Sequence, residues 1–461
     1  MAKIVGCMIV KNEEDYLEAS INSFIKYVDR LIVVDDCSTD DTLEILSRMA
    51  EADPKIYFYS EGFRGDKTKQ RNAAVTLAVP QEGDIVFFPD GDEIYGVHLP
   101  RFFWEFQNSN CLTAEFDFQH YWRDFIHEIK GHVWGQYLQR VYKWEPGLKY
   151  VYHNSISRAD GTYLSTYTKE HGMHMHFPDL NIYHCSYVKP AHKIREKIRY
   201  YLKRDTKNSD AEVDELIEMH PYFSDRYDYP RYGEGGLSCC GAVDGIPDRV
   251  IKTYHVPPEL RNHPNYTLYH DYALAMNKYM EEHWQFNNHL HFPHHQERLK
   301  YTAEFLEGSC VEIGCANGDS MRFLKRFNPE ISIEGVEPTD WGSGEAKKNH
   351  ECRQFYAENL PILDNSFDTV LLSEMIEHVQ DPEPALNEAF RIAKKRVVIT
   401  TPAKPHPDPD HKRVITPDKM RELLASRAKE VKICGLTDFS QPVRRVDNEE
   451  EIHFMIVVAE L

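Results

Sequence analysis

Short apolar segments alternate with helical segments in two separate stretches of this chain, and this alternation constrains the fold more than any other feature. In the first stretch, strands are expected at residues 3–10, 30–34, 56–59 and 84–89, with helices near 12–27, 43–46 and 66–79. In the second, strands are expected at 310–313, 333–336, 369–372, 396–400 and 452–459. Strands and helices that alternate at this spacing predict two α/β domains built on parallel sheets.

The length of 461 residues also requires more than one domain. We expect a first domain at 1–207, a helical or irregular connector or second lobe at 208–295, and a last domain at 296–461. Residues 189–207 predict an amphipathic helix with a basic outer face, which is either solvated or contacts an anionic acceptor or a membrane surface.

Composition limits the partners and the compartment. A net charge of −20 argues against a nucleic-acid backbone as the main partner. The ten cysteines show no CxxC spacing, which favours reduced thiols. No stretch approaches the roughly 20 apolar residues of a membrane span. These features favour a cytoplasmic location, and peripheral membrane contact remains compatible with them.

Acidic residues follow two of the first-stretch strands. Asp90 and Asp92 come directly after the strand at 84–89, and Asp35 and Asp36 end the strand at 30–34. Ligands of parallel sheets bind at the carboxyl ends of strands. Paired carboxylates there suit a hard divalent cation that holds phosphate oxygens, whereas a single Asp-x-Asp is usually a solvated turn.

Four motifs in register carry a resemblance. The segments MIVKNEEDYLEASINSF, LIVVDDCSTDDTLEIL, GDKTKQRNAAVTLA and DIVFFPDGDEIY follow one another over the first 95 residues. Their order resembles family 2 glycosyltransferases of the GT-A fold, which transfer a sugar from a nucleotide-diphospho-sugar such as a UDP-, GDP- or dTDP-sugar. The resemblance implies that the nucleotide and diphosphate are bound by Asn12, Glu13, Asp35, Asp36, Asp66, Arg71 and Asp90. It also implies that Asp90 and Asp92 hold Mn²⁺ or Mg²⁺.

Later segments resemble one branch of that family. Arg140-Val-Tyr-Lys143 and the segment IYHCSYVK at 182–189 are similar to two of its elements, and the second implies that His184 is a third metal or diphosphate ligand. The acid that the branch often carries shortly before the first element is missing. Inverting transfer needs a base for the acceptor hydroxyl, and the candidates are Asp124, Glu128 and His153, with Asp124 favoured.

The second stretch opens with a different nucleotide-site pattern. In SCVEIGCANGDSMRFL, Gly314 and Gly318 let the backbone approach a ligand at a helix N-terminus. Glu337 ends the next strand, at the spacing of about 20 residues that is typical of a ribose-binding acid. This pattern alone does not distinguish NAD from S-adenosylmethionine.

The continuation AENLPILDNSFDTVLLSEMIEHVQDPEPALNEAFRIAKKRVVITTP resembles class I S-adenosylmethionine-dependent methyltransferases, which have a Rossmann-like fold. The resemblance implies three groups of contacts. The methionine end is surrounded by Glu312, Gly314, Ala316 and Gly318. The ribose is held by Glu337 and Pro338, and adenine lies beside Glu358, Asn359 and Leu360. Ser373, Glu374 and His378 border the reaction pocket, where His378 or His411 could act as a base.

These resemblances predict a bifunctional enzyme. The first domain would transfer a sugar to a glycan, a lipid-linked saccharide or a protein. The second would methylate an oxygen of the same glycan, a hypothesis motivated by the fusion of both domains in one chain. Three alternatives stay open. One domain is inactive and serves as a binding module, or the first domain glycosylates a nucleic-acid base, which the acidic charge disfavours. The third is a non-enzymatic interaction scaffold, which the intact donor motifs in both halves disfavour.

Overall fold

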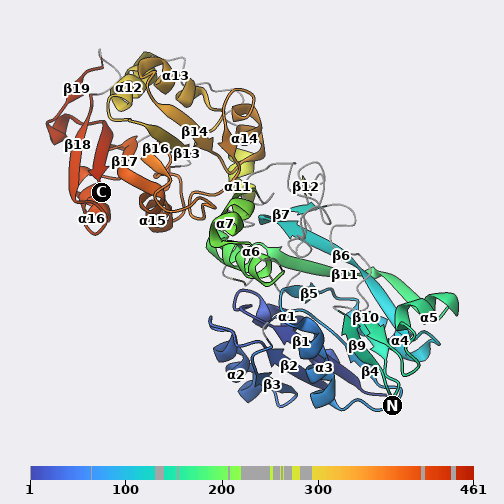
Figure 1. Ribbon diagram of the computed structural model, residues 1–461. Coiled ribbons are helices and arrows are strands. Elements are labelled where there is room, and N and C mark those ends of the chain that lie inside the picture. The colour runs from blue at the N-terminus through green and yellow to red at the C-terminus, as the bar shows by residue number, and fades with distance from the viewer. Residues whose placement is uncertain are drawn as a thin grey trace. The chain divides into compact units, whose positions relative to one another are not determined.

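The computed structural model describes twelve parts of the chain: residues 2–63, 65–129, 140–152, 155–205, 208–219, 250–252, 260, 263, 273–280, 293–405, 411–437 and 443–461. The chain divides into two compact units (Figure 1). Unit 1 consists of Met1–Lys189, Lys197–Asp214 and Tyr227–His270, and unit 2 of Pro190–Glu196, Glu215–Arg226 and Asp271–Leu461. Each unit is built on its own sheet.

The sheet of unit 1 has a parallel half and a mostly antiparallel half. The parallel half has the order β4-β1-β2-β3, and β8 pairs antiparallel with β4. The long strand β11 runs alongside β6 and also pairs antiparallel with β5 (Figure 1). The strands of this sheet are β1 Ile4–Val10, β2 Arg30–Asp35, β3 Ile56–Ser60, β4 Ile85–Phe87, β5 Glu93–Tyr95, β6 Thr113–Trp122, β7 Asp124–Ile129, β8 Val141–Lys143, β11 His174–Tyr187 and β12 Val250–Lys252. β9 Lys149–Tyr152 and β10 Ser155–Ser157 form a separate two-stranded antiparallel sheet.

Helices cover both faces of the parallel half because its strands are apolar on both sides. One core contains side chains of α1, α2 and α4. The other contains side chains of α3 together with Leu148, Tyr150 and Ile156 from the region of β9 and β10. The helices that lie wholly in unit 1 are α1 Leu17–Phe24, α2 Thr42–Ala52, α3 Lys67–Ala78, α4 Leu99–Asn108 and α5 Leu164–Glu170. α6 Ala191–Asp205 and α7 Asp210–Met219 each have residues in both units.

The sheet of unit 2 has the order β15-β14-β13-β16-β17-β20-β18-β19. Its first five strands are parallel and follow the order of a doubly wound nucleotide-binding fold. β20 pairs antiparallel with both β17 and β18. The strands are β13 Ser309–Ile313, β14 Ser332–Val336, β15 Cys352–Arg353, β16 Phe367–Ser373, β17 Ala393–Pro402, β18 Glu430–Leu436, β19 Arg445–Val446 and β20 Phe454–Glu460.

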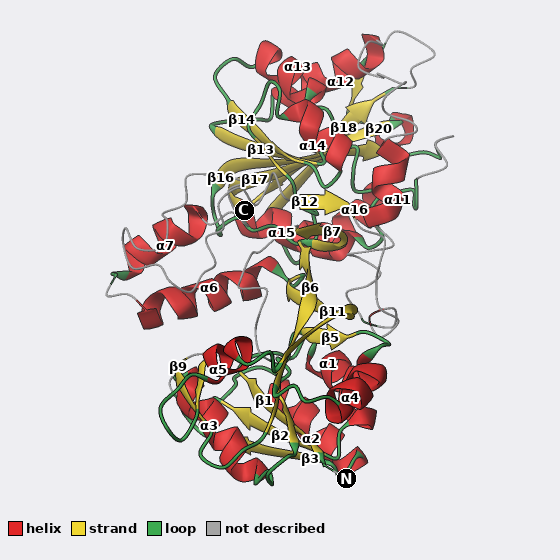
Figure 2. Cartoon of the chain, turned by 90° about the vertical axis from the view of Figure 1, so that its right-hand side faces the viewer, coloured by secondary structure: helices red, strands yellow, loops and turns green. Residues whose placement is uncertain are grey.

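Helices lie on both sides of this second sheet, with α13 and α15 on opposite faces (Figure 2). The parallel strands are fully buried in their central residues, as the apolar runs predict. The helices are α11 Ala273–Tyr279, α12 Pro293–Ala303, α13 Asp319–Phe327, α14 Asp340–Ala346, α15 Pro382–Ile392 and α16 Pro417–Leu424. The α/β class predicted for both stretches is therefore confirmed.

One element differs from the sequence-based expectations. The first helix begins at Leu17 rather than at Asn12, because Asn12 has a left-handed φ of 53° and lies in a loop. Unit 2 takes in α11 and α12, and the expected domain bounds at 208 and 296 stay predictions. The basic residues Arg199 and Lys203 of α6 pair with Asp214 and Asp210, so part of its basic face is neutralised within the chain.

Two further observations concern the whole chain. Among the residues that the structure describes, no helix is long and apolar enough to cross a membrane. The eight cysteines within the described ranges are free thiols.

Candidate active sites

The acids of unit 1 meet where β1, β2 and β4 end. Asp90 forms an isolated parallel bridge with Ile9 just beyond β4, and the carboxylates of Asp35 and Asp36 follow β2. Asp92 lies two residues further, immediately before β5. Asp35, Asp36 and Asp92 are all buried. The sheet therefore gathers several carboxylates at one edge, as strand-end placement predicts.

Asp90 is bound by two buried arginines. Its Oδ2 lies 2.6 Å from Nη2 of Arg140, and its Oδ1 lies 3.7 Å from Nη2 of Arg71. Arg140 also forms an ion pair with Glu93. Burial opposes ionisation of Asp90, but Arg140 and Arg71 outweigh burial and lower its pKa. The Asp90 carboxylate is thus ionised and holds the two guanidinium groups in position.

Glu93 is the third acid in this cluster. Its Oε2 accepts hydrogen bonds from the Tyr95 hydroxyl at 2.7 Å and from the backbone N–H of Asp90 at 3.1 Å. Burial raises the pKa of Glu93 to about 7, with Arg140 acting in the opposite direction. These contacts fix the turn that carries Asp90 and Asp92.

Asp92 faces Lys197 and His184. Its Oδ2 accepts a hydrogen bond from Nζ of Lys197 at 3.0 Å, and its Oδ1 lies 3.8 Å from Nε2 of His184. Burial opposes ionisation, yet Lys197 and then His184 lower the pKa of Asp92 well below its ordinary range. Lys197 was not identified from the sequence as a site residue, although the amphipathic pattern of residues 189–207 placed it on a basic helix.

Strand pairing explains why His184 reaches Asp92. His184 of β11 is in register with Glu93 of β5 on one side and with His120 of β6 on the other. The Nδ1 atoms of His184 and His120 lie 3.0 Å apart. Burial lowers the pKa of His184 to about 4 despite the nearby Asp92 carboxylate. Its imidazole is therefore neutral near pH 7, which is the form that binds metal ions.

Glu13 joins the same cluster from the loop after β1. Its Oε2 lies 2.5 Å from Nζ of Lys189, and its Oε1 lies 3.6 Å from Nζ of Lys197. Burial raises the pKa of Glu13, and the two lysines act in the opposite direction. Lys189 is the last residue of the segment at 182–189, and it is almost fully buried.

The remaining predicted nucleotide residues are held by local contacts. Asp36 accepts from the backbone N–H groups of Phe63 and Gly65 at 2.5 and 2.8 Å, and Asp35 accepts from the hydroxyls of Ser38 and Ser60. The Asn12 side chain accepts from the backbone N–H of Thr39 at 2.8 Å. Asp66 caps α3 by accepting from the backbone N–H of Lys69. Asp36 and Asp35 therefore order the loops that surround the strand ends.

Two of the three candidates for the base, Asp124 and Glu128, lie within the described residues. Asp124 is buried and accepts from the backbone N–H groups of Ile126 and His127, both at 2.9 Å, and its Oδ1 lies 2.8 Å from Nδ1 of His127. These contacts suit an acid that positions His127 and a tight turn. Glu128 lies in β7, paired with Tyr121 and Ile251. His153 lies outside the described residues.

The residues around Asp92 fit a divalent cation. Ions bound to nitrogen and oxygen ligands at about 2.1 Å bring those ligand atoms within about 4.2 Å of one another. The 3.8 Å between Asp92 Oδ1 and His184 Nε2 is within that span. A carboxylate and a neutral imidazole are suitable donors, so Asp92 and His184 could hold Mn²⁺ or Mg²⁺, while Lys197 adds a fixed positive charge.

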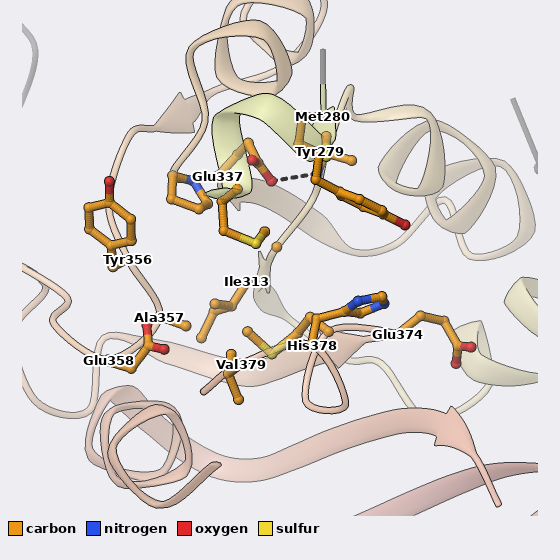
Figure 3. Close-up of a pocket in the computed structure, with 15 residues that line it drawn as sticks. Tyr279, Met280, Ile313, Glu337, Tyr356, Ala357, Glu358, Glu374, His378 and Val379 are labelled. Carbon is orange, nitrogen blue, oxygen red and sulfur yellow. Dashed lines mark hydrogen bonds between the residues drawn. The ribbon is translucent and has the colours of Figure 1, made fainter. Parts of the chain in front are cut away.

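Unit 2 contains a pocket at the carboxyl ends of β13, β14 and β16 (Figure 3). The residues predicted from the sequence that line it are Gly314, Ala316, Glu337, Pro338, Glu358, Glu374 and His378. Other lining residues were not predicted: Met276, Tyr279, Met280, Ile313, Tyr356, Ala357, Met375 and Val379. Figure 3 shows that Tyr279 and His378 lie near each other, and their ring centroids are 6.1 Å apart.

The turn after β13 requires glycine at Gly314. Its φ is 77°, and an added Cβ would lie 3.0 Å from Cβ of Met375. Gly318, with a φ of 80°, is the N-cap of α13 and does not line the pocket. Because Gly314 has no side chain, a ligand can approach its backbone closely, as the glycine-containing turn predicts.

Glu337 connects this turn to the end of β14. Its Oε2 accepts from the backbone N–H of Ala316 at 3.0 Å, and its Oε1 accepts from the backbone N–H and hydroxyl of Thr339 at 3.0 and 2.5 Å. Burial raises the pKa of Glu337, and the hydrogen bonds act in the opposite direction. A carboxylate has about four acceptor positions, so Glu337 retains capacity for hydroxyl groups of a ligand.

Glu358 presents a different environment at the pocket wall. Its Oε2 is buried without a hydrogen-bond partner within the described structure, and burial raises its pKa to about 7. Unpaired buried carboxylate oxygens are rare and indicate a missing donor. Glu358 could accept a hydrogen bond from a ligand in the pocket.

Other predicted residues support the pocket without lining it. Glu312 accepts from the Ser320 hydroxyl at 2.6 Å, and burial raises its pKa to about 7. The Ser373 hydroxyl accepts from Nη1 of the buried Arg298, a residue that carries no sequence signal. Asn359 accepts from the backbone N–H of Ala191 instead of facing the pocket. The Leu360 N–H donates to Glu388 at 2.7 Å.

Comparisons with known proteins agree with this division into two sites. Residues 7–117 match the model of Glycosyl transferase family 2, and residues 277–431 match a Methyltransferase domain model. Two curated glycosyltransferases are similar at 23% identity over 201 residues: the SPbeta prophage-derived glycosyltransferase SunS of Bacillus subtilis (strain 168) and glycosyltransferase SunS of Bacillus phage SPbeta. The match covers 42% of this chain and 42% of either relative, so the chain spans less than half of their length.

Solved structures that are similar include several methyltransferases. An S-adenosylmethionine-dependent methyltransferase of Thermotoga maritima, a possible histamine N-methyltransferase, is 23% identical, with 40% of this chain and 98% of that chain covered and a TM-score of 0.35. Another, from Archaeoglobus fulgidus, is 17% identical, with 39% and 100% covered and a TM-score of 0.32.

Proposed function

Because the chain carries a family 2 glycosyltransferase domain and a methyltransferase domain, we propose that it is a bifunctional enzyme that transfers a sugar and a methyl group at two separate sites. The first site would use a UDP-, GDP- or dTDP-sugar with Mn²⁺ or Mg²⁺, and the second would use S-adenosylmethionine. The observation that supports the first site best is the cluster of Asp92, His184 and Lys197 at the strand ends.

The main charge that develops during sugar transfer is on the leaving diphosphate. A cation held by Asp92 and His184 would stabilise that charge. Lys197, which contacts Asp92, and Arg71, which lies near Asp90, would add positive charge beside the leaving diphosphate, while Arg140 holds Asp90 in position. Asp35, Asp36, Asn12, Glu13 and Asp66 order the surrounding loops, where the nucleotide is proposed to bind.

The acceptor hydroxyl needs a base that takes its proton. Asp124 is engaged by two backbone N–H groups and by the His127 imidazole, so we infer that it positions His127 instead of taking the proton itself. Glu128 and His153 remain candidates for the base. The proposed acceptor is a glycan, a lipid-linked saccharide or a protein.

The second site is proposed to hold S-adenosylmethionine in the pocket of unit 2. Glu337 would bind the ribose hydroxyls, and the unpaired carboxyl of Glu358 would accept from the adenine amino group. The methionine end would lie along the turn at Gly314 and Ala316. Methyl transfer depends mainly on in-line placement of the acceptor atom, which would lie beside His378. We place the start of this domain at α11, because Met276 and Met280 line the pocket.

We further propose that the methyl group is added to an oxygen of the same glycan that the first domain extends. The fusion of both domains supports this coupling. To test it, purified full-length protein would be incubated with both donors and candidate acceptors, and the products would be analysed by mass spectrometry. The coupling predicts a product that carries both the sugar and the methyl group. Methylation confined to acceptors unrelated to the glycosylated product would contradict it.

A second candidate is that the first domain binds a nucleotide-sugar without transferring it. The engagement of Asp124 in structural contacts favours this alternative. Donor turnover, measured as release of nucleoside diphosphate from UDP-, GDP- and dTDP-sugars with and without Mn²⁺, distinguishes the two. Metal-stimulated release supports the transferase, and binding without release supports the binding module.

A further inference from the structure

Three side chains with metal-binding atoms meet at the edge of the unit 2 pocket. Glu377, His378 and His411 each offer one ligand atom, and these atoms all lie within 4.8 Å of one another. The rings of His378 and His411 are nearly perpendicular, with centroids 4.7 Å apart. Ligand atoms that bind one metal ion at about 2.1 Å lie within about 4.2 Å of one another. Small side-chain rotations would therefore bring these three atoms to metal-binding distance.

The two segments that carry these residues are tied together by the backbone. The N–H of Lys412 donates to the carbonyl of Glu377 at 2.9 Å. The Arg413 guanidinium donates to the carbonyls of Ile376, Val379 and Gln380 at 3.1, 2.6 and 2.7 Å. Arg413 thus fastens the segment after His411 to the loop that carries Glu377 and His378, which preorganises the three side chains.

The carboxylate of Glu377 provides an independent observation. Glu377 is only 1% exposed, and its Oε2 accepts from the Thr401 hydroxyl at 3.1 Å. Its Oε1 is buried and has no hydrogen-bond partner in the described structure. Leaving a buried acceptor unpaired is unfavourable by about 1–3 kcal/mol, and more for a charged group. A cation beside Oε1 would remove this penalty.

We propose that Glu377, His378 and His411 bind one divalent transition-metal ion beside the methyl-donor pocket. Two imidazoles and one carboxylate suit Zn²⁺, Fe²⁺ or a similar ion and leave coordination positions open. His378 also lines the pocket, so an ion that it binds would lie at the pocket wall.

The ion has a role in the methyl transfer proposed above, and this role rests on that proposed function, whereas metal binding itself does not. An acceptor hydroxyl bound to the ion would have a lowered pKa and would lose its proton to solvent. Its oxygen would then form the new C–O bond as the C–S bond of S-adenosylmethionine breaks and S-adenosylhomocysteine leaves. The ligand set thus favours an oxygen acceptor.

The test uses Co²⁺ as the probe and the full chain with Asp92→Asn, which removes the cation site of unit 1. Bound Co²⁺ would be measured by its visible absorption and by elemental analysis after gel filtration, with S-adenosylmethionine affinity measured in parallel. We expect Glu377→Gln and His411→Asn each to lose one equivalent of Co²⁺ while the affinity for S-adenosylmethionine stays within about twofold. His453→Asn, outside the pocket, is the matched control and should keep that equivalent.

Unchanged Co²⁺ binding in both variants would overturn the metal site. If Glu377→Gln fails to fold, His411→Asn decides, because His411 is only partly buried. Loss of S-adenosylmethionine binding in the parent protein would instead contradict the proposed methyl transfer. If the protein binds one equivalent of Co²⁺ but transfers no methyl group, the metal site stands and only its proposed role in methyl transfer is contradicted.

Discussion

The Nζ atom of Lys197 lies 3.0 Å from Oδ2 of Asp92, the second acid of the Asp-x-Asp segment. Lys197 belongs to α6, more than 100 residues further along the chain, and the same ammonium group lies 3.6 Å from Glu13. The carboxylate proposed to hold a cation therefore already has a positive side chain on one oxygen and a neutral imidazole near the other. This arrangement predicts how sugar transfer depends on a metal ion and on the charges of Asp92 and Lys197.

Replacing Asp92 by Asn should abolish most sugar transfer. Loss of one group that stabilises transition-state charge typically reduces kcat by about 10²–10³-fold, and we expect at least a 100-fold decrease in nucleoside diphosphate release. Binding of S-adenosylmethionine should be unchanged, which calorimetry can verify. Turnover within a few-fold of the parent would contradict the assignment of Asp92.

Replacing Lys197 by Met should increase the apparent affinity for Mn²⁺. Lys197 repels a cation at Asp92, and removing one charge about 4 Å away is worth about 1 kcal/mol even in a water-like dielectric, or about fivefold in affinity. The same variant should bind the nucleotide diphosphate more weakly. Activity would be titrated against Mn²⁺.

Lys203→Met is the matched control for Lys197→Met, because Lys203 lies on the same helix and pairs with Asp210. It should leave the Mn²⁺ titration unchanged. A Lys197→Met protein that needs more Mn²⁺ than the parent would indicate that Lys197 supports metal binding instead of competing with it.

Replacing Glu337 by Gln should weaken S-adenosylmethionine binding. Hydrogen bonds to charged groups contribute about 1.5–3 kcal/mol, so the Kd should rise by about 10- to 100-fold in isothermal titration calorimetry. Glu334→Gln provides the control, since Glu334 is on the same strand but pairs with Arg353 and does not line the pocket. Equal affinities in the two variants would argue against a ribose contact at Glu337.

The stability of unit 2 should depend on pH through Glu312. Burial raises its pKa to about 7 in the folded state, compared with about 4.3 in an unfolded chain. Because the folded pKa is the higher one, the stabilising contribution is complete below about pH 4 and is lost as the pH rises through about 7. Between about pH 5 and about pH 8 the free energy of unfolding should fall, with an upper bound of about 3 kcal/mol from this group.

Scanning calorimetry at both pH values would measure this effect, with the transition of unit 2 identified by its shift on addition of S-adenosylmethionine. Glu312→Gln should flatten the pH dependence of that transition. Glu422→Gln on α16 changes an exposed acid and should leave the dependence as in the parent. A steeper or unaltered dependence in Glu312→Gln would contradict the role of burial.

Features set by local pattern were predictable from the sequence. The strand ends that carry Asp36, Asp90 and Glu337 follow from apolar runs, and the turn at Gly314 follows from its glycine. The α/β class and the two families follow from the same segments. The left-handed conformation of Asn12 was missed, because residues 12–15 are all polar and contain no glycine or proline that would separate the loop from the helix.

Residues that reach a site through tertiary contacts carried no readable signal. Lys197 and Arg298 come from helices outside the motifs, and nothing in their spacing indicates which acid they approach. Tyr279 and Met276 line the second pocket from a helix in a segment expected to be a connector. The identity of the glycosyl-transfer base was open for the same reason, since it depends on how irregular strands fold around the acceptor.

The central claim is that the chain holds two independent donor sites, and titration calorimetry on one sample of full-length protein tests it most directly. S-adenosylmethionine and then UDP, GDP or dTDP with Mn²⁺ would be titrated in both orders. The account predicts one equivalent of S-adenosylmethionine and one of a nucleotide, each with the same Kd whichever is added first. Absence of binding of either ligand class, or competition between them for one site, would contradict it.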